Sequence, residues 1–163
     1  MKIDLYQTFG TIATILSIIS LLCKNKKSLL KIQLISNFLY SLQYLVINAI
    51  SASYVTLVAM LRCILFTNEN NKIKKLLFLI ILAIIAGLFS FDGTFLSFIP
   101  IINSIICIYG ASLKNVKHYK LVYGAVSAIW IYYNFKVGAT VIIIANICEI
   151  IAAIIEYFRN ENE

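Results

Sequence analysis

Long apolar runs separated by short polar breaks follow one another along the whole chain. A helix needs about 20 mostly apolar residues to cross a bilayer, and each run approaches that length. The breaks are too short to hold a separate domain. The pattern predicts an all-α integral membrane protein with seven transmembrane helices, at 6–23, 29–48, 51–67, 76–91, 95–113, 119–136 and 139–158.

Basic residues divide unequally between the two sides that these seven spans define. The breaks after the first, third and fifth spans share one side with the C-terminal end, whereas the opposite side carries only Lys2 and Lys136. Cytoplasmic loops are rich in Lys and Arg, so we expect the N-terminus outside and the C-terminus in the cytoplasm. The basic residues of the expected cytoplasmic side are Lys24, Lys26, Lys27, Lys31, Lys72, Lys74, Lys75, Lys114, Lys117, Lys120 and Arg159.

Composition excludes two other classes of protein. Apolar residues make up 61% of the chain and charged residues 13%, with a mean hydropathy of +0.92. Soluble domains are about 45–50% apolar and about 25% charged, and disordered chains are poor in branched aliphatic residues. Both classes are therefore excluded.

Only Lys2 precedes the first apolar run and Asp4 follows closely, so we expect a retained helix and no signal peptide.

The net charge of +7 resides in brief clusters between apolar runs. This distribution fits loops that face an anionic lipid leaflet, and no nucleic-acid partner is expected. The cysteines stand alone without a CxxC pair, which favours reduced apolar fillers over disulfides or a metal site. They are Cys23, Cys63, Cys107 and Cys148.

An internal repeat emerges when the chain is shifted by 90 residues. The basic segment 24–27 then falls on 114–117, and Ala49 falls on Ala139. The order of long helix, basic loop, helix, tight turn and helix also occurs twice. This predicts two parallel three-helix bundles joined by an inverting helix: a first bundle at 1–67, a basic loop with the linker helix at 68–94, and a second bundle with a short cytoplasmic tail at 95–163.

Two stretches carry a resemblance to a known family. The segment 24–62 contains the basic loop, a polar helix, the tight turn and a Leu-Arg ending, and the segment 128–151 reads AIWIYYNFKVGATVIIIANICEII. Together they resemble the YgjV-like bacterial inner membrane proteins. The wider resemblance is to the SWEET, PQ-loop and nicotinamide-riboside transporter folds. It implies the 3+1+3 plan and the bacterial cytoplasmic (inner) membrane.

Polar side chains inside the expected spans recur at helical spacing. In the second span Gln33, Asn37, Tyr40 and Tyr44 follow one another at i, i+4, i+7 and i+11, which is one helix face. Such groups are costly in lipid and should face the bundle interior or a water-filled cavity. They either line a central cavity or bond neighbouring helices together. Matching stripes are Tyr123, Ser127, Trp130 and Asn134; Pro100, Asn103, Cys107 and Gly110; and Asn146, Glu149 and Glu156.

The resemblance to SWEET carriers implies a substrate pocket at Trp130 and Asn146, because those carriers place Trp and Asn at the matching points of a bundle. The first half departs from that pattern, with Tyr40 and Thr56 at the equivalent positions. An alternative is that Trp130 packs between helices or faces lipid. The remaining pocket candidates are Asn37, Tyr44, Asn134 and Asn103.

Two charges lie deep in the spans. Glu149 is the deepest acid, and Arg62 matches Ala152 in the repeat. Arg62 and Glu149 should therefore differ in depth by about one helical turn or less. We expect either a buried ion pair or a proton-coupling role for Glu149. Pro100 and its counterpart Gly10 are candidate hinges, or else simple packing kinks.

These features favour a small-solute transporter or facilitator that works by alternating access, with a small polar or aromatic metabolite as cargo. The alternative is a nontransporting scaffold or regulatory protein of the membrane. No enzymatic activity and no cofactor are expected, because His118 stands alone and no HExxH, GxSxG or Walker sequence occurs. The bilayer is the expected partner, and the chain is a monomer or a homodimer.

Overall fold

The computed structural model describes residues 5–68, 70–91 and 93–159, and all regular structure in those ranges is helical. The prediction of an all-α fold is therefore confirmed, while Lys2 and Asp4 lie outside the described residues. The elements are α1 (Leu5–Leu22), α2 (Lys26–Val46), α3 (Ile50–Thr67), α4 (Lys72–Phe89), the 3-10 helix η1 (Phe95–Ser97), α5 (Phe98–Ser112), α6 (Val116–Val137) and α7 (Thr140–Arg159).

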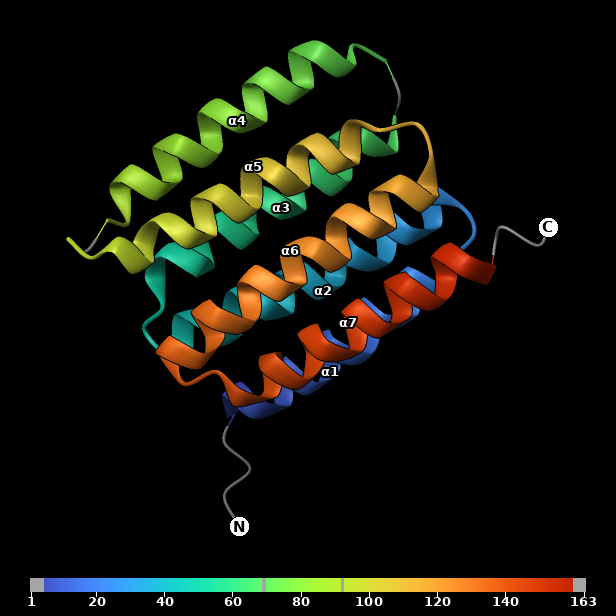
Figure 1. Cartoon of the computed structure of the whole chain (residues 1–163). Coiled ribbons are helices and arrows are strands. Elements are labelled where there is room, and N and C mark those ends of the chain that lie inside the picture. Colours follow the sequence, from blue (N-terminus) through green and yellow to red (C-terminus); the bar gives the residue numbers. More distant parts are fainter. Residues whose placement is uncertain (1–4, 69, 92, 160–163) are drawn as a thin grey trace.

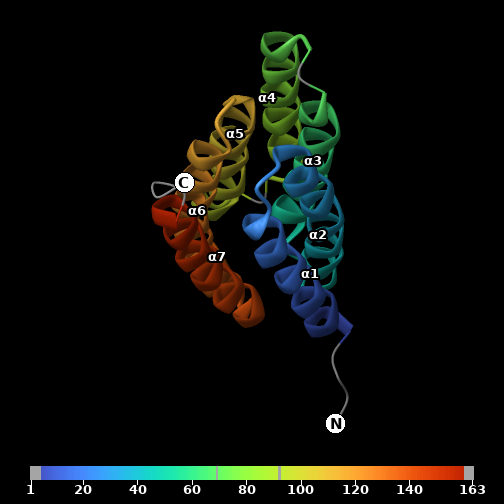
Figure 2. The same ribbon diagram turned by 90° about the vertical axis from the view of Figure 1, so that its right-hand side faces the viewer.

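Six of these helices form a closed ring. Helix α1 packs on α2 and α7, α2 on α3, α3 on α5, and α6 on both α5 and α7. Figures 1 and 2 show α1, α2 and α3 on one side of the ring and α5, α6 and α7 on the other. Helix α4 packs on α3 and α5 from outside the ring.

The helix starts repeat with the same offset of 90 residues as the sequence. Asn25 and Asn115 cap α2 and α6 alike: each side chain accepts a hydrogen bond of 2.9 Å from the backbone N–H two residues later. This is the usual N-cap interaction, which satisfies a helix-end donor that has no partner within the helix.

The tight turns before α3 and α7 also match. Ala49 N–H bonds to Tyr44 O, and Ala139 N–H bonds to Asn134 O, both at 2.9 Å. The residue before each alanine has a left-handed backbone, with φ of 58° at Asn48 and 75° at Gly138. The N-caps and the tight turns of the two halves therefore match.

Three segments are long and apolar enough to cross a membrane by length and composition: Ile50–Thr67, Phe95–Ser112 and Thr140–Arg159. Their mean hydropathies are 1.7, 1.8 and 2.2, and Gln7–Leu22 is a shorter apolar helix. Helices α2 and α6 are less apolar because they carry polar stripes, whereas α4 is strongly apolar but begins with three lysines. Seven spans therefore stay a prediction.

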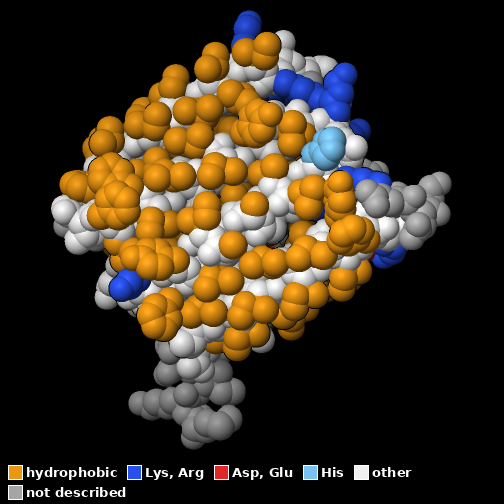
Figure 3. Space-filling model, in the orientation of Figure 1, with side chains coloured by type: hydrophobic (Ala, Val, Ile, Leu, Met, Phe, Trp, Pro, Cys, Tyr) orange, Lys and Arg blue, Asp and Glu red, His pale blue; other side chains and the backbone are white. Residues whose placement is uncertain are grey.

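The outer surface of the ring is apolar. Figure 3 shows hydrophobic side chains over most of one face, and large apolar residues such as Leu45, Ile102 and Ile144 are exposed. Polar and charged residues of the same helices are instead buried, among them Gln33, Asn103 and Glu149. This inversion of the usual soluble pattern suits a lipid solvent.

Several helix boundaries differ from the sequence-based prediction: α2 begins at Lys26 rather than at 29, and α6 begins at Val116 rather than at 119. Helix α4 begins at Lys72 rather than at 76, and the Lys75 ammonium caps the end of α3 by donating to Leu65 O at 2.8 Å and Asn68 O at 2.6 Å. The expected span 95–113 starts with the 3-10 turn η1 before α5. Pro100 therefore lies in the first turn of α5, where its missing N–H leaves no intrahelical bond unmade.

We expect Gly138→Ala to lower the free energy of unfolding by about 1 kcal/mol, because an alanine resists the left-handed conformation. No atom lies within 4 Å of the added Cβ, so strain rather than a clash is the cause. Asn48→Gly at the equivalent turn is the control and should match or exceed the wild type. Thermal unfolding in detergent measures both, and equal losses in the two variants would contradict the argument.

Candidate functional site

A cavity of about 60 Å³ lies inside the ring, among the middle turns of α2, α3, α5, α6 and α7. Residues spaced by three or four share a helix face, and the polar faces of these helices point toward the cavity. The structure thus brings to one place most of the side chains that the sequence analysis singled out. Those that line the cavity are Trp130, Asn146, Tyr40, Thr56, Asn37, Tyr44 and Asn103, with Arg62 and Glu149.

Asn134 does not line the cavity but connects its residues. The Tyr44 hydroxyl donates to Asn134 Oδ1 at 2.7 Å, and Asn134 Nδ2 donates to Asn146 Oδ1 at 2.9 Å. Asn146 Nδ2 then donates to Glu149 Oε2 at 3.1 Å. The chain of bonds runs from α2 through α6 to α7, so it joins the two sides of the ring.

Glu149 is the acceptor on which further donors converge. Its side chain is 2% exposed, and the Ser127 hydroxyl donates to Oε2 at 2.7 Å while the Ser17 hydroxyl donates to Oε1. Ser17 also lies 3.3 Å from the Tyr123 hydroxyl. The carboxylate therefore obtains its donors from α1, α6 and α7 without a cation.

Arg62 lies at the same cavity but apart from Glu149. In the part of the chain that the structure describes, the two residues form no ion pair with each other, and the ion pairs present involve Glu156 instead. The Arg62 side chain is 2% exposed and lies near Tyr119, Cys107 and Cys63. Both charges therefore share the cavity, and each has its own surroundings.

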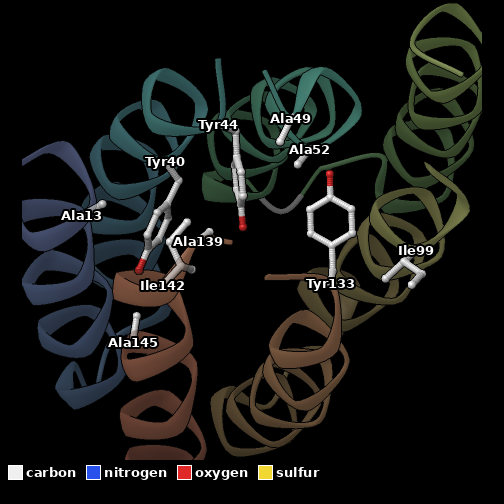
Figure 4. Close-up of a cluster of buried hydrophobic side chains, with 10 residues drawn as sticks. All are labelled: Ala13, Tyr40, Tyr44, Ala49, Ala52, Ile99, Tyr133, Ala139, Ile142 and Ala145. Carbon is white, nitrogen blue, oxygen red and sulfur yellow. The ribbon is translucent and has the colours of Figure 1, made fainter. Parts of the chain in front are cut away.

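Aromatic rings fill the end of the cavity near the tight turns. Tyr44 stacks on Trp130 with ring centres 5.8 Å apart and planes at 24°, and Tyr133 meets both rings edge-on. In Figure 4, Tyr40 and Tyr44 project from α2 while Tyr133 projects from α6 in the opposite direction. Trp130 thus packs among rings and also contacts the cavity.

Two tyrosine bridges join α2 to α6 on either side of the cavity. Tyr44 of α2 bonds Asn134 of α6 toward the tight turns, and Tyr119 of α6 bonds Gln33 of α2 toward the basic loops. Gln33 and Tyr44 are separated by about 16 Å along α2 at 1.5 Å per residue. The cavity lies between these bridges.

The hinge candidates are both buried. The Cβ of an alanine at Gly10 would clash with the Gln43 side chain, so the glycine allows α2 to pack close to α1. Neither terminal atom of the Gln43 amide has a hydrogen-bond partner among the described residues. Gly10 therefore has a packing role at the point where the sequence analysis expected a hinge.

The family model for Imp-YgjV, described as "Bacterial inner membrane protein", matches residues 4–163. The chain belongs to the Imp-YgjV family of bacterial inner membrane proteins. No curated protein and no solved structure matches it. Membership confirms the family resemblance and the inner-membrane location, and it implies that the apolar surface of this Imp-YgjV protein contacts lipid.

The sequence analysis missed one buried cluster of this Imp-YgjV protein. It placed Lys120 near the start of the sixth span among the basic residues of the cytoplasmic side and predicted no partner for it, but Lys120 is 2% exposed and pairs with Glu156 at 2.8 Å. Arg159 pairs with Glu156 as well, at 2.7 Å. The signal was present, because Lys120, Ser127 and Asn134 recur at intervals of seven and so share a helix face.

We expect Glu149→Gln to lower the free energy of unfolding by about 1–3 kcal/mol. The new amide nitrogen is a donor, and it would face the Ser17 donor or the Ser127 and Asn146 donors that now bond to the carboxylate. Thermal unfolding monitored by circular dichroism in detergent measures the loss. An unchanged unfolding temperature would contradict the argument that the hydrogen bonds from Ser17, Ser127 and Asn146 to the Glu149 carboxylate stabilise the fold.

Glu156→Met should destabilise the protein more than Lys120→Met. The first variant strands a buried lysine, at a cost of about 3–5 kcal/mol for a broken buried pair, whereas Arg159 still pairs with Glu156 in the second. Unfolding temperatures of the two variants give the comparison. An equal fall in unfolding temperature in both variants, or a larger fall in Lys120→Met, would contradict the pairing of Glu156 with both Lys120 and Arg159.

Proposed function

We propose that this protein is a small-solute transporter or facilitator of the bacterial inner membrane that works by alternating access. The observation that carries the proposal is the polar cavity at mid-helix, enclosed between two α2–α6 tyrosine bridges, one supplied by each repeat. Transporters built from repeats hold their substrate at the interface of the two halves, near the bilayer midplane.

In this proposal all seven helices span the membrane in the 3+1+3 arrangement. The two groups are α1–α3 and α5–α7, which meet along the α1–α7 and α3–α5 contacts, and α4 inverts the second group so that both enter in the same direction. The loops that carry most lysines would face the cytoplasm. The Tyr44–Asn134 bridge then closes the outer side and the Tyr119–Gln33 bridge closes the inner side.

In this proposal both bridges are formed in the structure, and the cavity is small. A dry cavity of about 150 Å³ suffices to bind benzene, so a cavity of about 60 Å³ holds only water or a very small solute. A larger cargo enters when one bridge separates and the two helix groups tilt apart. A coupling role for Glu149 would require its hydroxyl and amide donors to leave the carboxylate during the same cycle.

The test uses Thr56→Cys as a reporter in the cavity, with the four native cysteines replaced by serine. A small membrane-impermeant thiol reagent is added from outside to intact cells. We expect Tyr44→Phe to raise the labelling rate about 2- to 10-fold and Tyr119→Phe to lower it, because each variant removes one hydrogen bond worth about 0.5–1.5 kcal/mol.

Tyr54→Phe is the matched control, since Tyr54 is exposed on α3. Its labelling rate should equal that of the parent. A reporter that no variant exposes, or a rise in both bridge variants, would contradict alternating access and favour the nontransporting scaffold or regulator.

A further inference from the structure

We infer that the cavity binds a small monovalent oxyanion, such as a short carboxylate, through Arg62, Asn103 and Ser104. This names a substrate class and, as far as transport is concerned, rests on the proposed function. Binding itself stands on the cavity alone.

The first observation is a buried cation without a matching acid. Glu149 and Glu156 are the only acidic residues in the part of the chain that the structure describes. The first binds Ser17, Ser127 and Asn146, and the second pairs with Lys120 and Arg159. Neither forms an ion pair with Arg62 in the described ranges, although Glu149 lines the same cavity. Its nearest polar neighbours include two thiols, which are weak acceptors, so its positive charge lacks a strong acceptor.

The second observation concerns the α5 side of the same cavity. Asn103 is fully buried and Ser104 is 5% exposed. Both amide atoms of Asn103, the Ser104 hydroxyl and Arg62 Nε have no hydrogen-bond partner among the described residues. Buried polar groups are nearly always paired, so unmet donors that line one cavity indicate a bound polar species.

The chemistry of these groups selects an oxyanion. A guanidinium offers several N–H donors in a planar fork that matches two oxygens of one anion. The Asn103 amide and the Ser104 hydroxyl add neutral donors, and Asn103 Oδ1 can accept from a water or from a hydroxyl of the solute. Water alone would satisfy the donors, but it would leave the charge uncompensated. The cavity volume of about 60 Å³ limits the anion to a few heavy atoms in this closed state.

Trp130 provides the readout, because it is the single tryptophan of the chain and lines the cavity. Purified protein in detergent is titrated with sodium formate, acetate or nitrate at constant ionic strength, with gluconate as the balancing anion. Gluconate is too large for the closed cavity. We expect a saturable change in Trp130 fluorescence with the small oxyanions. Chloride serves as a further arm, and a response to chloride as strong as that to the oxyanions would overturn the oxyanion assignment.

Arg62→Gln should raise the half-saturating concentration about tenfold or more, the loss expected for a charged hydrogen bond of about 1.5–3 kcal/mol. Arg159→Gln is the matched control, because Arg159 is half exposed at the end of α7 and does not line the cavity. It should bind like the wild type.

Asn103→Asp guards against misfolding of the first variant. It supplies an internal carboxylate in the cavity that Arg62 lines, so the protein should stay folded in circular dichroism and lose anion binding. No saturable response in the wild type, or the same response in Arg62→Gln and Asn103→Asp as in the wild type, would overturn the inference.

Flux into proteoliposomes separates this inference from the proposed function. Arg62-dependent binding without uptake of labelled acetate or formate would keep the anion site and contradict transport of these anions. Labelling that alternates at position 56 without any anion response would keep alternating access and overturn the anion site.

Discussion

A carboxylate buried in an apolar helix bundle must find donors inside the protein, and Glu149 finds them on three helices. Ser17 of α1, Ser127 of α6 and Asn146 of α7 all bond to it. Since an ionised group costs several kcal/mol to desolvate without such partners, its position and theirs depend on one another. Through Asn146 and Asn134 the network reaches Tyr44 of α2, so it fixes both the α1–α7 contact and one bridge across the ring.

The two halves share their N-caps and tight turns but place different charged residues at the cavity. The N-caps Asn25 and Asn115 and the turns at Ala49 and Ala139 make identical bonds. At the cavity the two halves differ. With the offset of 90 residues, Ala59 is the equivalent of Glu149, and Ala152 is the equivalent of Arg62. The α3 side thereby carries a cation and the α7 side an anion. Matching caps and turns therefore surround a cavity whose two sides carry opposite charges.

Local sequence determines most of what could be predicted. Apolar runs bounded by Asn caps and basic breaks give the helix ranges to within a few residues, and the spacing of Gln33, Asn37, Tyr40 and Tyr44 gives the buried face of α2. The relation between Arg62 and Glu149 was beyond that reasoning. The rise of 1.5 Å per residue fixes depth along a helix, but it leaves open where each helix stands in the ring. Two charges at similar depth can therefore face different neighbours.

The same limit applies to Lys120, which the sequence places near the cytoplasmic end of a span and whose partner Glu156 comes 36 residues later, on another helix of the ring. Such pairs arise from packing of the whole bundle. Packing also breaks the symmetry of the ring at its two contacts between halves. Helix α4 covers the α3–α5 contact from outside, and no described helix covers α1–α7 in the same way. There the Ser17–Glu149 bond crosses from one half to the other. The uncovered contact has a buried polar interaction where the covered one has an extra helix, so loss of the Ser17–Glu149 bond should weaken the α1–α7 contact more than the α3–α5 contact.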